Sequence, residues 1–150
     1  MYSDPMKIKK GLPIYAIILS IFLFFLQHIS QLPPQVKSID SPLEVFSGER
    51  AYETLKYLLK ENKPHPVGSD LNKVIKDRLI DELEKLDIKY EVQKTWACAS
   101  RYAGCAEVEN LIGIIPGKTK APYLALMAHY DSVPMASGAG DDGAGVVAIL

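Results

Sequence analysis

Residues 123–145 read YLALMAHYDSVPMASGAGDDGAG, an uninterrupted apolar run that leads into a polar, glycine-rich segment. The apolar run, residues 123–128, predicts a central strand that is covered by helices on both faces. His129 and Asp131 follow this strand directly, and Asp141 comes ten residues after Asp131. Because ligands gather at the carboxyl ends of strands in open α/β sheets, the three side chains are candidates for a two-metal hydrolytic site.

The chemistry of these side chains suits metal binding. Imidazole is a common zinc ligand, and its second nitrogen usually donates to a carboxylate, a position that Asp131 can fill. A carboxylate such as Asp141 has two oxygens and can bridge two cations. Each short motif alone is unspecific, because His129 could be a solvated loop residue bonded to Asp131, and Asp-Asp-Gly is an ordinary turn. Their combination after a buried strand is the specific signal.

Hydrophobic periodicity predicts the elements around this segment. The expected elements are helices at 47–62 and 70–86, strands at 88–93, 108–115 and 123–128, and a helix that begins at Asp142. The buried face of the second helix comprises Ile75, Leu79, Leu83 and Leu86. We therefore expect an α/β fold, a mixed sheet with helices on both faces, which residues 1–150 contain only in part.

An apolar segment near the N-terminus predicts a transmembrane helix. Residues 12–29 follow Lys7, Lys9 and Lys10, and as a helix they would be about 27 Å long, close to the ~30 Å hydrocarbon core of a bilayer. A cleaved signal peptide is the alternative, but no small-x-small cleavage site follows Leu26. A buried core helix is disfavoured because the segment lacks a polar face. We expect an uncleaved signal-anchor with a cytoplasmic N-terminus, since the lysines precede the span.

Composition narrows the remaining classes of protein. The 150 residues carry a formal net charge of −1 and a pI of about 6.3, so no nucleic-acid-binding surface is expected. The hydrophobic share of 48% is enough for one core beside the apolar N-terminal block. Cys98 and Cys105 are the only cysteines, and in an exported protein they favour a disulfide. Two idle thiols are the alternative, and no C-x-x-C pair indicates a zinc finger.

Five motifs resemble the co-catalytic zinc exopeptidases, the family of bacterial leucyl aminopeptidase and glutamate carboxypeptidase. His129–Ser132 and Gly138–Gly145 look like the first metal-binding segment of that family. FSGERA at 46–51, PHPVGS at 64–69 and NLIGIIPG at 110–117 resemble its membrane-anchored vacuolar and endoplasmic-reticulum branch. The resemblance therefore covers the whole chain after the expected linker.

The resemblance implies a role for each residue of the motif. His129 resembles a ligand of one zinc, Asp131 the carboxylate that orients it, and Asp141 the carboxylate that bridges two zincs. Asp142 is not a ligand in the family pattern. In enzymes of that family, a water held by the metals attacks the peptide carbonyl while a Glu acts as general base. That Glu and the later ligands lie downstream in the family, so we expect residues 1–150 to be an N-terminal part of a longer enzyme that is inactive alone.

The implied organisation has four segments, namely a cytoplasmic N-terminus (1–11), a transmembrane anchor (12–29), a linker (30–46) and the N-terminal part of a peptidase domain (47–150). The first hypothesis is an aminopeptidase that acts on peptides outside the cytoplasm. Its location would be the periplasmic face in a bacterium, or the lumen of the vacuole or endoplasmic reticulum in a eukaryote. A carboxypeptidase or a glutaminyl cyclase on the same fold, and a non-catalytic receptor or scaffold ectodomain, are the alternatives. Residue preference and oligomeric state cannot be derived from the sequence.

Other conspicuous side chains receive structural explanations. His65 lies between two prolines and is expected to stabilise a loop rather than to contact a pocket, because no acidic residue is spaced to help it bind metal. Ser132 is not on a G-x-S-x-G elbow, so we do not expect a nucleophile. Glu107 and Glu109 precede the motif, and we do not expect them to replace the missing glutamates.

Overall fold

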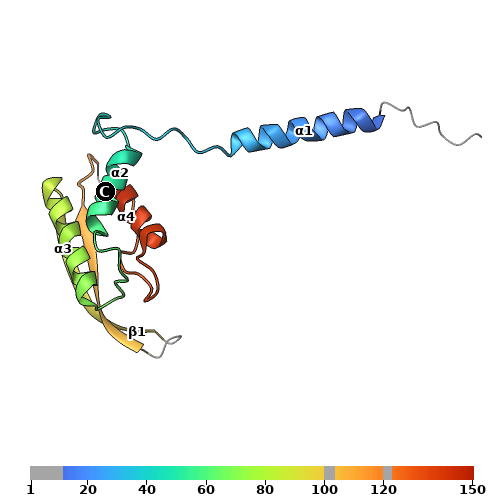
Figure 1. Ribbon diagram of the computed structural model, residues 1–150. Coiled ribbons are helices and arrows are strands. Elements are labelled where there is room, and N and C mark those ends of the chain that lie inside the picture. Colours follow the sequence, from blue (N-terminus) through green and yellow to red (C-terminus); the bar gives the residue numbers. More distant parts are fainter. Residues whose placement is uncertain (1–11, 100–103, 120–122) are drawn as a thin grey trace, which may run out of the picture. The chain divides into compact units, whose positions relative to one another are not determined.

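The computed structural model describes residues 12–99, 104–119 and 123–150, and the chain divides into two units. Unit 1 is Met1–Gln35 and unit 2 is Val36–Leu150. Unit 2 combines helices with a small antiparallel sheet (Figure 1), which agrees with the predicted α/β class in its coarse form.

Unit 1 contains α1, Leu12–Ser30, a helix long and apolar enough to cross a membrane. The window Pro13–Ser30 has a mean hydropathy of 1.8, and none of it is buried. By its length and composition, α1 is therefore a candidate membrane span. An anchor and a signal sequence share this length and composition.

The segment before α2, Gly48–Leu58, is folded onto the first turn of that helix. The Arg50 guanidinium donates to four backbone carbonyls within residues 39–45, over distances of 2.6–3.3 Å. The Ser47 hydroxyl accepts the Arg50 N–H at 3.2 Å and donates to the Ser38 carbonyl at 2.7 Å. We call this arrangement of Ser47, Arg50 and residues 36–46 the linker clasp. It occupies the end of the predicted linker and explains the FSGERA motif.

Two helix ends differ from the sequence-based expectation. α2 ends at Leu58 rather than near Asn62, and Asn62 adopts a left-handed backbone conformation with φ 48° that Asn tolerates and a helix does not. α3, Asp70–Lys85, begins where predicted, capped by the Ser69 hydroxyl. α3 ends at Lys85, and Leu86, which was expected on its buried face, is the C-cap residue and is exposed.

The core of unit 2 lies where three helices meet. Its buried residues come from α2, α3 and α4, Ala144–Ile149, and they are Leu58, Ile75, Leu79 and Val147. Leu83 on α3 is also buried, so three of the four predicted core positions of that helix are confirmed. Burying aliphatic side chains in this way is the main stabilising contribution to such a small unit.

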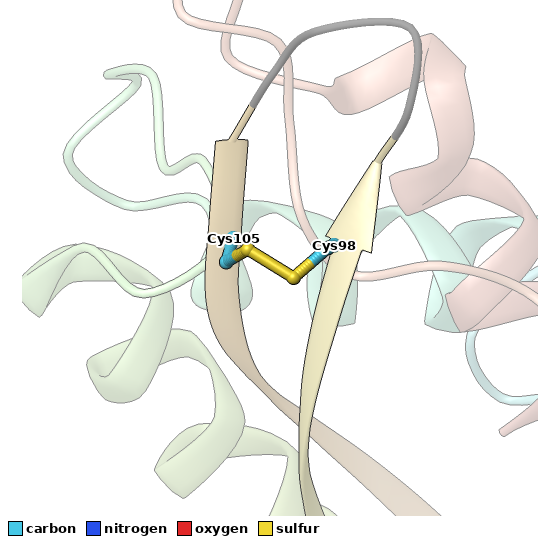
Figure 2. The surroundings of a disulfide bond; sticks show 2 residues. All are labelled: Cys98 and Cys105. Atoms are coloured by element: carbon cyan, nitrogen blue, oxygen red, sulfur yellow. A yellow bond between two sulfur atoms is a disulfide. The ribbon is translucent and has the colours of Figure 1, made fainter.

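The sheet is a single hairpin of β1, Lys89–Ala99, and β2, Gly104–Ile114, with α3 beside it (Figure 1). The strands are antiparallel, and their register runs from Lys89 opposite Ile114 to Ala99 opposite Gly104. Both strands are longer than the alternation of apolar residues predicts. Cys98 and Cys105 stand directly opposite each other and are joined by a disulfide (Figure 2).

The predicted central strand at 123–128 is wrong for the described part of this chain. Residues 123–130 have no strand assignment, and Tyr123 and Met127 are 100% and 90% exposed. A strand forms only where a neighbouring strand supplies backbone hydrogen bonds. Within residues 12–99, 104–119 and 123–150, β1 and β2 pair only with each other. The mixed sheet covered on both faces is therefore not present in these residues.

Candidate metal centre

The structure brings the three predicted site residues together. The Nε2 atom of His129 lies 3.0 Å from Oδ1 of Asp141. The Nδ1 atom lies 3.1 Å from the backbone oxygen of Asp131 and 3.5 Å from its Oδ1. Each ring nitrogen therefore faces an oxygen, with the orienting contact made first by the main chain of Asp131 and only second by its carboxylate.

These contacts shift the pKa of the His129 imidazole. Partial burial lowers the pKa of His129, but the hydrogen bonds to Asp131 and Asp141 and the charges of both carboxylates outweigh it, so the pKa lies above its ordinary value. Cations are favoured here for the same reason, because both carboxylates stabilise positive charge between them. The ring would have to release the Nε2 proton to bind a metal ion there.

A tight turn presents the second aspartate. Gly138 precedes the turn Ala139–Gly143, in which Asp141 and Asp142 have non-helical backbone angles, and α4 begins at Ala144 rather than at the predicted Asp142. Asp141 is exposed on this turn, and its peptide bond to Asp142 is cis. The Asp142 carboxylate instead accepts the backbone N–H of His129 at 3.4 Å. The turn thus directs Asp141 to the imidazole ring and Asp142 to the main chain.

Tyr130, which sequence reasoning did not single out, anchors this segment to the core. Its hydroxyl donates to the backbone oxygen of Glu109 at 2.6 Å, and burial raises the pKa of Tyr130 to about 12. The side chains of an extended segment alternate between two sides. The apolar ring of Tyr130 therefore packs inward, while His129 and Asp131 remain available for the site. The alternation of residues 129–131 is the sequence signal that could have identified it.

Glu109 has a structural role in the hairpin. Its carboxylate forms ion pairs with Lys76 on α3 and Lys94 on β1, and these hydrogen bonds lower the pKa of Glu109. Three elements are thus joined beside the carbonyl that receives the Tyr130 hydroxyl. The Glu109 carboxylate is therefore engaged in ion pairs that hold the hairpin and α3 together.

His65 and Ser132 form a buried hydrogen-bonded pair near the candidate site. Both are buried, and the backbone N–H of His65 donates to the Ser132 hydroxyl at 2.8 Å. The His65 ring stands in the core with Nδ1 3.1 Å from the Lys63 carbonyl. The position of His65 matches a loop-stabilising residue, and the Ser132 hydroxyl is enclosed rather than presented to substrate.

Zinc fits the two donors that face each other. Ligand atoms about 2.1 Å from a tetrahedral zinc lie about 3.4 Å apart, so Nε2 of His129 and Oδ1 of Asp141, now 3.0 Å apart, would separate by a few tenths of an ångström. Among the described residues, no group of three or more His, Cys, Asp or Glu side chains is arranged to hold one metal ion. A complete zinc site would need further ligands.

The sequence of this chain is similar to those of known peptidases. Residues 110–150 match the model of peptidase family M28. The chain is 30% identical to a vacuolar membrane protease of Coprinopsis cinerea over 161 aligned positions, which cover 93% of this chain and 16% of that protein. Vacuolar membrane proteases of Kluyveromyces lactis (32% identical, 59% of this chain, 12% of the relative) and Candida albicans (33%, 58% and 11%) also match. The chain thus spans less than a fifth of the length of these curated relatives.

Proposed function

We propose that this chain, a member of peptidase family M28 and similar to vacuolar membrane proteases, supplies part of the metal centre of a zinc-dependent aminopeptidase. The observation that carries the proposal is the pairing of His129 Nε2 with Asp141 Oδ1 at 3.0 Å, across a turn and beside a second carboxylate. The family match covers the same residues, which makes a chance pairing of a histidine with an aspartate a poor explanation.

Each side chain then has a specific task. His129 would hold one zinc through Nε2, and Asp141 would bridge two zincs through its two carboxylate oxygens. The backbone oxygen of Asp131 accepts the Nδ1 proton, so Nε2 is the nitrogen that would bind the metal once its own proton is released. The Asp131 carboxylate adds negative charge beside the ring and makes it a better donor.

Zinc, when bound, supplies a Lewis acid that polarises the peptide carbonyl and acidifies a water molecule. The residues of this chain prepare that chemistry by orientation, since Asp142 accepts the His129 backbone N–H and the adjacent Tyr130 is anchored to the Glu109 carbonyl. We propose that the general-base glutamate and the remaining ligands come from residues outside 1–150. By this proposal, residues 1–150 alone do not hydrolyse peptides.

The proposal extends to the compartment. Disulfides persist in oxidising compartments, and the pairing of Cys98 with Cys105 supports an extracytoplasmic location for the region after α1. With α1 as an uncleaved anchor, the lysines before it favour a cytoplasmic N-terminus. The name of the relatives directs the proposal to the vacuolar lumen. Protease treatment of intact vacuoles should remove an N-terminal tag and leave the region after α1 intact, and the opposite pattern would contradict this orientation.

The central test uses the complete protein with His129→Ala and Asp141→Asn. Both variants should lose bound zinc, measured by elemental analysis, together with hydrolysis of leucine p-nitroanilide. Asp40→Asn is the matched control, because Asp40 is exposed in the linker clasp and its side chain has no described role. Full zinc content and activity in the two site variants would eliminate the proposal. Hydrolysis of peptides blocked at the N-terminus would replace the aminopeptidase by a carboxypeptidase.

A further inference from the structure

We infer that His65 and Ser132 are positioning residues that close the base of the metal-site loop. The inference rests on the proposed metal centre and concerns how its two ligands are held in place. The metal-site loop is defined as residues 129–141, with His129 at one end and Asp141 at the other. Neither His65 nor Ser132 touches a metal or substrate in this proposal.

The first observation is a reciprocal pair of hydrogen bonds across 67 residues of sequence. The backbone N–H of His65 donates to the Ser132 hydroxyl at 2.8 Å, and the backbone N–H of Ser132 donates to the His65 carbonyl at 3.3 Å. The two residues are 2% and 4% exposed, which shields both bonds from water. Breaking these bonds would leave buried polar groups without partners and would destabilise the folded state. The pairing therefore fixes the position of Ser132.

The second observation is the close approach of Gly138 to the same pair. Gly138 is buried with φ 71°, and a Cβ atom there would lie 3.0 Å from Cβ of Ser132 and 3.3 Å from Cε1 of His65. Its carbonyl accepts the N–H of Gly143 at 2.8 Å and so closes the turn that carries Asp141. A side chain here would be strained by the backbone angle and crowded by Ser132 and His65.

The positions of these contacts within the loop give them their meaning. Ser132 follows His129 by three residues, and Gly138 precedes Asp141 by three residues. Between the two contacts, the chain is exposed at Val133 and Met135. His65 therefore contacts the loop at both Ser132 and Gly138. The segments that carry His129 and Asp141 are fixed at the same place in the core.

This arrangement also gives Ser132 a role other than that of a nucleophile. Its hydroxyl accepts the His65 N–H and donates to the Val133 carbonyl at 3.1 Å, so its single proton is already engaged. The PHPVGS motif acquires a function as well, because it delivers His65 to the base of the loop. Holding ligands in place before the metal arrives reduces the entropy lost on binding.

The test measures the zinc affinity of the complete protein by calorimetry, with Ser132→Ala against Ser137→Ala. Ser137 lies in the same loop, and its side chain has no described hydrogen bond. Ser132→Ala should weaken zinc binding about tenfold, the lower range for residues that orient metal ligands, while Ser137→Ala binds zinc as the unaltered protein does. Excess zinc should restore hydrolysis in Ser132→Ala, because both proposed ligands remain.

A second pair of variants covers the case in which Ser132→Ala does not fold. Gly138→Ala should also weaken zinc binding, whereas Gly140→Ala should not, because a Cβ at Gly140 meets no atom within 4 Å. Unchanged zinc affinity in folded Ser132→Ala, or in Gly138→Ala, would overturn the inference and leave the proposed function standing. Absence of zinc binding in the unaltered protein would instead contradict the proposed function itself.

Discussion

The linker clasp should fail locally when the Arg50 guanidinium is removed. Two of its four hydrogen bonds, to the carbonyls of Ser41 and Val45, are partly buried and only 2.6 Å long, whereas the other two are exposed. Counting about 1–1.5 kcal/mol for each of the two partly buried bonds and nothing for the exposed pair gives about 2–3 kcal/mol for Arg50→Met. Because 1.36 kcal/mol corresponds to a factor of ten, residues 36–47 should exchange their amide protons about 30- to 160-fold faster.

Hydrogen exchange followed by mass spectrometry measures this change on the peptide that covers residues 36–47. The amides of Ser41 and Val45, each bonded within the loop at 3.0 Å, are the most direct reporters. Lys60→Met is the control, since Lys60 is an exposed cation of similar length just after α2. Exchange in Arg50→Met within threefold of the unaltered protein, or an equal acceleration in Lys60→Met, would refute the reasoning.

Three further predictions concern the core, the surface and the hairpin. Tyr130→Phe should lower the free energy of unfolding by about 1–2 kcal/mol in denaturant titrations, because a carbonyl of β2 loses its partner, while the exposed control Tyr52→Phe changes it by less than about 0.5 kcal/mol. The hydrogen bond from Arg78 lowers the pKa of Glu61 to about 2. The stabilisation from this pair is therefore complete above the pKa of the unfolded chain, near 4.5, and is lost as the pH falls towards 2. Arg78→Gln should return the pKa of Glu61, measured by NMR, to its ordinary value. Reduction of the disulfide, which spans seven residues of sequence, should lower stability by about 2–3 kcal/mol, and equal denaturation midpoints with and without reductant would contradict this.

The exposed apolar run at 123–128 marks the limit of pattern reading. Its composition indicates burial on both faces, yet Tyr123 and Met127 are almost fully exposed in the described residues. Periodicity reports how a segment would be covered, but it does not supply the neighbour that covers it. The same reasoning succeeded for α3, where Ile75 and Leu79 pack against helices that are present in this chain.

The proximity of the candidate site residues was predictable because they are close in sequence. His129, Asp131 and Asp141 lie within thirteen consecutive residues, and a glycine-rich turn was the evident means of bringing them together. Tyr130 and the roles of His65 and Ser132 were not predicted in this form. Their partners are distant in sequence, and no spacing rule relates a loop at 64–69 to a serine 67 residues later.

Sequence alone therefore determined what is set by neighbours along the chain: the apolar helix α1, the capped start of α3, and the histidine and aspartates of the candidate metal centre. Tertiary structure decided the contacts between residues that are distant in sequence. The Arg50 guanidinium selects the carbonyls of the linker clasp, Glu109 receives the Tyr130 hydroxyl, and His65 closes the metal-site loop. The physical reason is that helix periodicity and capping act over a few residues, whereas a buried hydrogen bond joins whichever groups the packed core brings together.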